Sequence, residues 1–487
     1  MIRKNDIGKK DRPIFFAIIF LPFLLVWPDI TNDIWFLLSS GRYVVQNGIP
    51  NIEPLTLHQG LEFVMQQWLS AVIFFSTYST FGLVGLKVIL VVFYALTVYV
   101  LFRLCMKLSD NYFFVSAGIT FLVSVVLGLW LSCRPIIFST LIFLLEIYFL
   151  ESFVLDKNKK HLFFIPILSL VLINMHAALW PMMFIILGPY IIDACRFNIG
   201  RISGQGYGVK AILAVTVISF AAGFINPYGW QAMTYLYRSY GHMEIENVVG
   251  EMKSPSPNNT MGAITFLAIF LVGFVYILHK TGRTNIRYAL LTVGTIYMTL
   301  SAQRCIMFFA ICASFPLAGY LRNLEVNIVE QERTKREKTL KKILLLGIIM
   351  TAAVVIINAP ITSGQPNAAI MAMDDVIDEI LADANPNELV LYTGYDDGGY
   401  AEFRGLKPYL DPRAEVFLIE NNKQKDILSE YYNMERGWLN YKDFLSRYQF
   451  THLIVNRSDS LYASLSNDAD YKAVYTNDYY TLFVTVD

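Results

Sequence analysis

Two aspartates, Asp29 and Asp33, come directly after the first long apolar stretch of the chain. A carboxylate at a membrane boundary is partly removed from water, which raises its pKa toward the range where it can exchange protons near neutral pH. Such a group can act as a general base, and a neighbouring carboxylate could orient the site or help to bind a metal ion. The structural alternative is that Asn32 or Asp33 only caps the following helix and that Asp29 is a solvated turn residue.

Two arginines occupy short turns between apolar stretches, Arg134 in Ser132–Cys133–Arg134–Pro135 and Arg304 in Gln303–Arg304. An arginine at membrane depth costs about 2.5–3.5 kcal/mol or more. One interpretation is that both side chains snorkel or cap helix carbonyls. The other is that they bind an anionic ligand such as a phosphate. His176 lies in a comparable turn, where a histidine is more often hydrogen-bonded within the protein than catalytic.

Composition indicates that these turns belong to a membrane protein. The chain has 487 residues, of which 55% are hydrophobic and 16% charged, whereas about a quarter are charged in a typical soluble protein. The 39 basic and 39 acidic side chains balance, so we expect no polybasic face and no nucleic-acid partner. The five cysteines have no metal-ligand spacing, which gives metal or disulfide roles little support.

A membrane span needs about 20 apolar residues, and eleven segments qualify. They are approximately 13–28, 84–104, 112–132, 135–154, 161–175, 177–195, 209–226, 261–279, 285–301, 303–321 and 341–359. A twelfth apolar stretch, 62–81, is ambiguous. If it does not cross, all the loops rich in Lys and Arg face the cytoplasm. We therefore predict a cytoplasmic N-terminus, an external C-terminus and interfacial helices at 34–46 and 62–81 in the first external loop.

This layout resembles the GT-C superfamily of membrane glycosyltransferases. Asp33–Ile34–Trp35 is similar to the Asp-x-Trp/Tyr of oligosaccharyltransferase catalytic subunits. Elements similar to those of bacterial GT-C-like proteins recur along almost the whole chain: DIWFLLSSGRYVVQNGIP, QQWL, CRPIIFS, NMHAALWP, INPYGW, AQRCIMFFA and YDDGGYAEFRGLKPYLDPRAEVF. The resemblance implies an essential acidic residue in a first external loop with two juxtamembrane helices. It also implies a sugar donor linked to polyprenyl or dolichyl phosphate. No WWDYG-like motif follows, so protein N-glycosylation is not expected.

With this resemblance, the site residues take expected roles. Asp33 is the candidate general base; Asp29 is the second candidate and, with Asp33, the candidate ligand of a divalent cation such as Mg or Mn. The donor phosphate would be held by Arg304, Arg134 and His176. The long loop 226–260 carries Glu244, Glu246 and Glu251. One of these glutamates could be a second acidic group facing Asp33, although a solvated acidic loop is the favoured alternative.

Residues 1–360 are expected to form the transmembrane domain and 361–487 a small extracytoplasmic α/β domain. Its predicted helices are about 370–384, 420–433 and 439–448, and its strands include ELVLYT, KPYLD, THLIVN and YTLFVTVD. Asp411 and Arg413 follow a predicted strand. They could contact polar groups of an acceptor, but an internal salt bridge is favoured.

The expected function is transfer of a sugar from a polyprenyl-phosphate carrier to a glycan, lipid or protein acceptor of the cell envelope, in contact with membrane lipids at the outer face of the plasma membrane. Two alternatives stay open. A flippase or transporter of lipid-linked intermediates is disfavoured because ionisable residues are scarce at mid-span, where transport sites usually lie. A non-catalytic scaffold would keep the fold without the activity.

Overall fold

The computed structural model describes residues 31–239, 241, 245, 249–279, 283–326, 368–385 and 388–486, without the side chains of 114, 323–326 and 383. The predicted spans at about 13–28 and 341–359 lie outside these residues. So do Asp29, Glu244 and Glu246.

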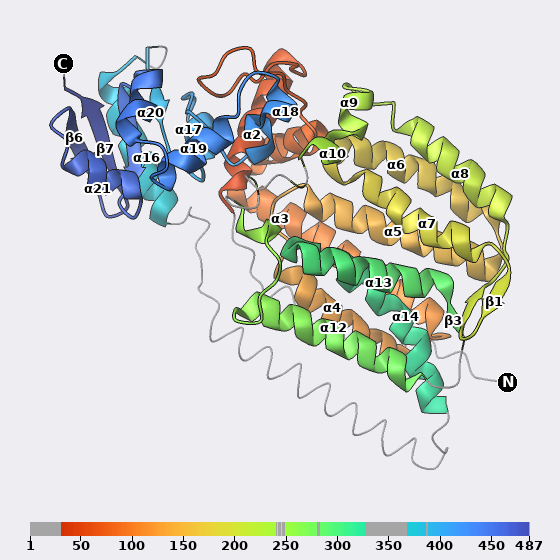
Figure 1. Ribbon diagram of the computed structural model, residues 1–487. Coiled ribbons are helices and arrows are strands. Elements are labelled where there is room, and N and C mark those ends of the chain that lie inside the picture. The colour runs from red at the N-terminus through yellow and green to blue at the C-terminus, as the bar shows by residue number, and fades with distance from the viewer. Residues whose placement is uncertain are drawn as a thin grey trace.

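A bundle of long helices forms the larger part of the molecule (Figure 1). The nine other predicted spans coincide with helices: α3 (Trp68–Leu108), α4 (Phe113–Gly128), α5 (Ile136–Asp156), α6 (Phe164–Met175), α7 (Pro181–Asp193), α8 (Val209–Ala222), α12 (Thr260–Leu278), α13 (Ile286–Ser301) and α14 (Ile306–Val326). Within the described residues, four helical segments are long and apolar enough to cross a membrane: α3, α5, α12 and Gln303–Arg322. The bundle is therefore that of a membrane protein, while the total of eleven spans remains a prediction.

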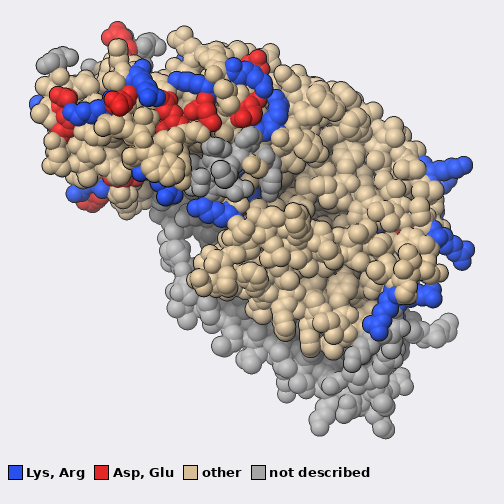
Figure 2. All heavy atoms as spheres, viewed as in Figure 1, with Lys and Arg blue, Asp and Glu red and all other residues tan. Residues whose placement is uncertain are grey.

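Charged side chains avoid the middle of the visible face. Figure 2 shows Lys and Arg at the end of the bundle where Figure 1 places β1 (Phe197–Ile199) and β3 (Thr284–Asn285), and mixed charges over the C-terminal elements. The belt between them is almost free of charge on this face. Such a distribution is the one expected for a protein whose middle lies in lipid.

The first loop contains two helices, as predicted. The first is α2 (Asp33–Asn47), and the second begins at Trp68 and continues as α3. Within α3 the backbone leaves helical geometry at Gly82 (φ 62°, ψ −156°), a conformation that glycine adopts at little cost. The predicted interfacial segment and the following span are thus two parts of one kinked helix.

An interfacial helix at 34–46 would turn Ile34, Trp35, Leu37, Leu38 and Val45 toward lipid, but of these five only Val45 is exposed. Ile34, Trp35, Leu37 and Leu38 are buried in protein. The Trp35 ring lies 4.9 Å from that of Tyr400 and 4.8 Å from that of Phe403, centre to centre. The cause lies in the tertiary structure, because the C-terminal elements pack on α2 and cover its apolar side.

The C-terminal part is built on a four-stranded sheet of order β4-β5-β7-β6, in which β4 and β5 are parallel and the other pairs antiparallel. The strands are β4 (Leu391–Tyr392), β5 (His452–Asn456), β6 (Tyr471–Thr476) and β7 (Tyr480–Thr485). The helices around it are α16 (Ala368–Asp383), α17 (Gly398–Phe403), α18 (Ile419–Asn422), α19 (Ile427–Glu435), α20 (Tyr441–Tyr448) and α21 (Ser460–Ser466). An α/β arrangement is therefore present.

Two details of this part differ from the sequence prediction. The prediction of a strand at KPYLD is wrong. In this segment only Pro408 forms a β-bridge, and its partner is Leu391. Proline has no N–H with which to extend a ladder. The helix expected at 420–433 is divided into α18 and α19, since Lys423 adopts a left-handed conformation (φ 62°) that ends α18.

A buried group of charges joins three helices near the end opposite the C-terminal part. Arg287 of α13 is 1% exposed and pairs with Glu151 of α5 (Nε–Oε1, 2.8 Å) and with Asp193 of α7 (Nη1–Oδ2, 2.5 Å). Arg287 lies at the start of α13, where a basic side chain would ordinarily be solvated. It is instead an internal ion pair, which satisfies the usual requirement that a buried charge be partnered.

Candidate active site

Asp33 and Arg134 form an ion pair at the start of α2. The distance between Asp33 Oδ2 and Arg134 Nε is 2.7 Å. Asn32 occupies the N-cap position of α2, where it makes no side-chain capping bond, and Asp33 is the first helical residue. The carboxylate of Asp33 is therefore directed to the arginine rather than used as the N-cap.

A third segment of the chain completes this contact. Arg134 Nη1 lies 3.3 Å from both carboxylate oxygens of Glu251 in the short helix η3 (Gly250–Met252). Glu251 belongs to the loop 226–260, for which the sequence favoured a solvated acidic loop and left a second acidic group as the alternative. The two carboxylates therefore share one guanidinium, and three segments that are far apart in sequence meet at it.

Burial dominates the electrostatics of Asp33. It raises the pKa of this carboxyl from 3.8 to about 6, because desolvation disfavours the charged form. The positive charge of Arg134 lowers the pKa, whereas the negative charges of Glu251, Asp396 and Glu415 raise it. Asp33 is therefore ionised at neutral pH and retains appreciable basicity, which are the properties required of a general base.

Asp396 and Glu415 were not among the predicted site residues. Asp396 follows β4, and Glu415 lies in the short helix η5 (Ala414–Phe417). Burial raises the pKa of both carboxyls, and the charge of Arg134 lowers that of Asp396. The segment YDDGGYAEF carried the available sequence signal, since an acidic pair there precedes two glycines.

Gly398 explains how that segment approaches the site. A Cβ atom at Gly398 would lie 1.8 Å from the carbonyl oxygen of Leu410, a distance that no side chain tolerates. Glycine is therefore required for α17 to begin against the strand-like segment around Leu410. This close packing fixes the position of the preceding Asp396.

Arg304 is the second of the two predicted phosphate-binding arginines. It lies in the short helix η4 (Gln303–Cys305), and its Nη1 is 3.1 Å from Met252 Sδ. Among the described residues, no carboxylate forms an ion pair with it. Its charge nevertheless reaches the site, because it lowers the pKa of Glu415.

His176 is hydrogen-bonded within the protein, which is the alternative that the sequence favoured. Its Nδ1 is 2.8 Å from the Ser139 hydroxyl oxygen. Burial and the charge of Arg304 lower the pKa of the imidazole to about 3, so the ring is neutral near pH 7 and cannot supply a positive charge to a phosphate. The hydrogen-bonded structural role is therefore the better interpretation.

Asp411 and Arg413 form an internal cluster, as the favoured alternative proposed. Arg413 Nη2 lies 2.5 Å from Asp411 Oδ2, 2.9 Å from Glu53 Oε1 and 3.0 Å from Glu402 Oε1. All four side chains are buried. Their location gives an acceptor no exposed surface, but it links the first loop to the C-terminal part directly before Glu415.

The divalent cation predicted at Asp29 and Asp33 stays a prediction on the residues that the structure describes. Within these ranges, no three His, Cys, Asp or Glu side chains are grouped as metal ligands. Oδ2 of Asp33 faces the guanidinium of Arg134. The other predicted ligand, Asp29, lies outside the described residues.

Comparison with known proteins places this geometry in a fold. No protein-family model and no curated protein sequence matches the chain, but solved structures do. AglB, the oligosaccharyltransferase of Archaeoglobus fulgidus, in complex with an inhibitory peptide and a dolichol-phosphate, has a TM-score of 0.59 at 11% identity over 92% of this chain and 70% of its own.

A second solved structure matches over nearly the full length of both chains. ArnT from Cupriavidus metallidurans, bound to undecaprenyl phosphate, has a TM-score of 0.52 at 10% identity over 99% of this chain and 98% of its own. Both proteins are GT-C glycosyltransferases. The resemblance seen in the sequence motifs is confirmed at the level of structure: this chain has the fold of the GT-C glycosyltransferases.

Proposed function

We propose that the protein is a GT-C-type glycosyltransferase. It moves a sugar from a polyprenyl-phosphate-linked donor to an acceptor of the cell envelope, at the outer face of the plasma membrane and with inversion at the anomeric carbon. The observation that carries the proposal is the pairing of Asp33 with Arg134, which gives a carboxyl with a pKa of about 6 beside cationic side chains. The dolichol-phosphate on AglB and the undecaprenyl phosphate on ArnT support the donor class.

The reaction requires two kinds of protein group, a base for the acceptor hydroxyl and a cation for the leaving phosphate. An acceptor hydroxyl attacks the anomeric carbon on the face opposite the phosphate, a new C–O bond forms, and the bond to the phosphate oxygen breaks. Asp33 accepts the proton of the attacking hydroxyl, and the electron pair of the broken bond leaves with the polyprenyl phosphate. A cationic group beside that phosphate stabilises the leaving anion.

The two arginines fit different parts of this step. Arg134 already shares its charge between Asp33 and Glu251, so its main effect is to hold the base and keep it ionised. Arg304 contacts a methionine sulfur and is free to form charge-assisted hydrogen bonds with a phosphate. We therefore assign the contact with the phosphate primarily to Arg304. Asp29 stays the second candidate for the general base.

The test uses the full-length protein in proteoliposomes. Synthetic polyprenyl phosphates that carry different radiolabelled sugars are supplied together with an envelope glycan and lipid extract, and label is followed into products other than the donor. We expect transfer for at least one donor. Asp33→Asn should reduce the rate about 10²–10⁴-fold, the usual effect of losing a general base.

Asp375→Asn is the matched control, because Asp375 is an exposed helical carboxylate on α16. It should transfer at the native rate. Movement of intact donor across the bilayer without cleavage would support the transporter instead. A protein that neither cleaves nor moves any donor would support the scaffold, and native transfer by Asp33→Asn would remove the base assignment.

A further inference from the structure

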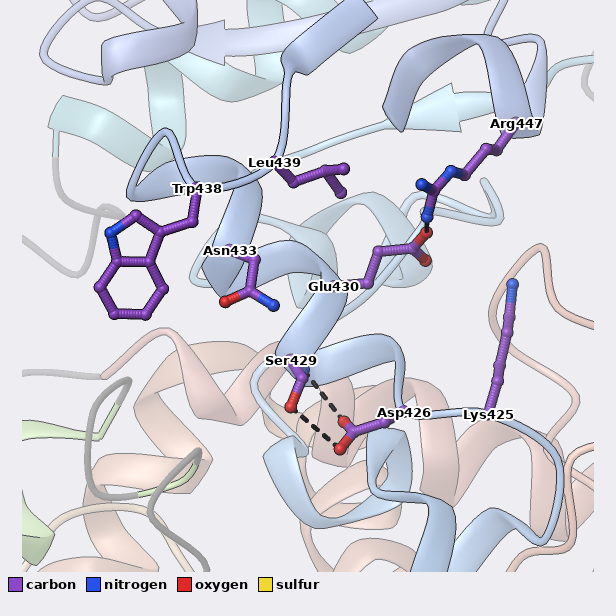
Figure 3. A pocket seen from close by; sticks show the side chains of 8 residues that line it. All are labelled: Lys425, Asp426, Ser429, Glu430, Asn433, Trp438, Leu439 and Arg447. Carbon is purple, nitrogen blue, oxygen red and sulfur yellow. Dashed lines mark hydrogen bonds and ion pairs between the residues drawn. The ribbon is translucent and has the colours of Figure 1, made fainter. Parts of the chain in front are cut away.

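A groove of about 530 Å³ opens on the C-terminal part (Figure 3). Its walls come from α19, from the turn that follows it and from α20, and its lining includes Asp426, Ser429, Glu430, Asn433, Trp438 and Arg447. The volume lies within the range of about 300–1,000 Å³ typical of small-molecule sites. None of these residues belongs to the site around Asp33.

An exposed indole stands at one end of this groove, as Figure 3 shows. Trp438 is 74% exposed. Its position is fixed by the backbone, because the carbonyl oxygen of Asn433 accepts hydrogen bonds from the N–H groups of Trp438 (2.8 Å) and Leu439 (2.9 Å). Tryptophan is enriched at interfaces, where its apolar ring packs against a partner and its N–H reaches a hydrogen-bond acceptor.

The rest of the groove is polar but electrically balanced. Arg447 pairs with Glu430 at 2.6 Å, and the Ser429 hydroxyl donates to Asp426 at 2.9 Å. Lys425 supplies the second positive charge. Among the described residues, the amide of Asn433 has no hydrogen-bond partner, although Figure 3 places it on the floor of the groove between Trp438 and Arg447.

We propose that this groove binds a neutral saccharide. A pyranose ring has an apolar face of C–H groups, which packs on the electron-rich face of an indole, and a rim of hydroxyls, which both donate and accept hydrogen bonds. The Asn433 amide and the neighbouring carboxylates and guanidinium offer both kinds of partner. The balanced charges of the groove select against a highly charged ligand.

This inference rests on the proposed function and narrows its acceptor to a glycan. One helix borders both places: Tyr431 of α19 accepts a hydrogen bond through its hydroxyl from the N–H of Tyr395 (3.3 Å), next to Asp396. An oligosaccharide held in the groove would therefore be bound on the same helix that supports the acidic side of the candidate active site.

The experiment measures binding without transfer. The full-length protein in detergent is applied to an array of neutral, amino-sugar and uronic-acid oligosaccharides. We expect retention on one neutral group. Trp438→Ala should weaken it at least about tenfold and Asn433→Ala severalfold. Trp230→Ala is the matched control. Trp230 begins α9 (Trp230–Met233), is 57% exposed and stacks with the ring of Phe224. Its loss should leave saccharide retention unchanged.

Failure of this inference and of the proposed function are distinguishable. Asp33→Asn should keep native saccharide binding while losing transfer, whereas Trp438→Ala should weaken saccharide binding at least about tenfold and raise the acceptor KM, with donor KM unchanged. Native retention by Trp438→Ala, or no retention of any saccharide by the native protein, would overturn the assignment. Retention only of acidic saccharides would do so as well, because the argument depends on the balanced charges.

Discussion

At the scale of single residues, the central feature is the opposition between burial and Arg134 at Asp33. Burial raises the pKa of this carboxyl and so disfavours its ionised form. The charge of Arg134 lowers the pKa and so makes the carboxylate a weaker base. Because burial is the larger effect, the pKa settles at about 6. A carboxylate in this range is ionised near neutral pH and still accepts a proton from an attacking hydroxyl.

The first prediction is a pH dependence. Only ionised Asp33 can act as a base, so kcat/KM should rise with pH up to about 6 and then level off. Arg134→Gln removes the charge that lowers the pKa of Asp33, so the acid limb should move to higher pH in this variant. Radiolabel transfer between pH 4.5 and 8.5 measures both profiles. An acid limb that stays at the same pH in Arg134→Gln would show that Asp33 does not control it.

The second prediction concerns the free energy of unfolding, whose dependence on pH through Asp33 has the opposite sign to that of most paired carboxylates. The pKa of Asp33 is about 6 in the folded protein against 3.8 for the ordinary group, so the folded state holds the proton more tightly. Its contribution to the free energy of unfolding is therefore lost as pH rises from about 4 to 6.

Asp33→Asn removes this loss, and Asn is about as good as Asp near a helix start. The variant should thus unfold at the same temperature as the native protein, or a higher one, at pH 7.5, and the difference should shrink toward pH 4. Thermal melting in detergent at both pH values checks this. A variant that melts well below the native protein at pH 7.5 would favour a structural role.

The third prediction is for Arg304→Gln. Loss of a charge-assisted hydrogen bond typically costs about 1.5–3 kcal/mol, which corresponds to a rise in the donor KM of about 10–150-fold. The contact with Met252 is weak, so melting should change little. Donor titrations of the reconstituted variant measure the effect. An unchanged donor KM would return Arg304 to the helix-capping role.

At the scale of elements, the site depends on how α2 and α17 are held together. Trp35 of α2 packs on Tyr400 and Phe403 of α17, and Arg42 of α2 donates to the carbonyl oxygen of Glu402 at 2.9 Å. The Arg413 cluster then ties the same region to Glu53 of the first loop. Burial and the charge of Asp411 raise the pKa of Glu402 well above its usual range, and the charge of Arg413 lowers it.

The fourth prediction follows from that cluster. Arg413→Met leaves buried carboxyls without their cation and should lower the free energy of unfolding of the C-terminal part by about 3–5 kcal/mol. Arg404→Met is the control, since Arg404 pairs with Asp374 and Asp378 near the surface, where such pairs contribute about 0–1 kcal/mol. Native-state proteolysis of the full-length protein compares the two. Equal cleavage rates would mean that the cluster does not hold the domain.

At the scale of the whole molecule, orientation in the membrane decides whether the site faces outward. The fifth prediction uses Cys195, which is exposed at the end of α7, whereas the other four cysteines are buried. A membrane-impermeant thiol reagent should label Ser458→Cys on intact cells, and Cys195 only after the membrane is permeabilised. The reverse pattern would place the candidate site on the cytoplasmic side.

The sequence by itself determined the features that depend on local composition. Long apolar runs predicted nine helices that the structure describes, and the short turns around Arg134 and Arg304 singled out two arginines that lie in or beside the site. Asp33 was identified in the same way, by its position after an apolar stretch and by the Asp-x-Trp resemblance. Each of these signals is contained within some twenty neighbouring residues.

Only the tertiary structure decided which distant groups meet. The pairing of Arg134 with both Asp33 and Glu251 joins segments more than a hundred residues apart, and Asp396 and Glu415 reach Asp33 only because α17 packs on α2. The same packing buries the side of α2 that the pattern assigned to lipid, and it turns Arg413 inward. Periodicity shows that a helix face is apolar, but the partner that covers it is set by the summed packing of the whole chain.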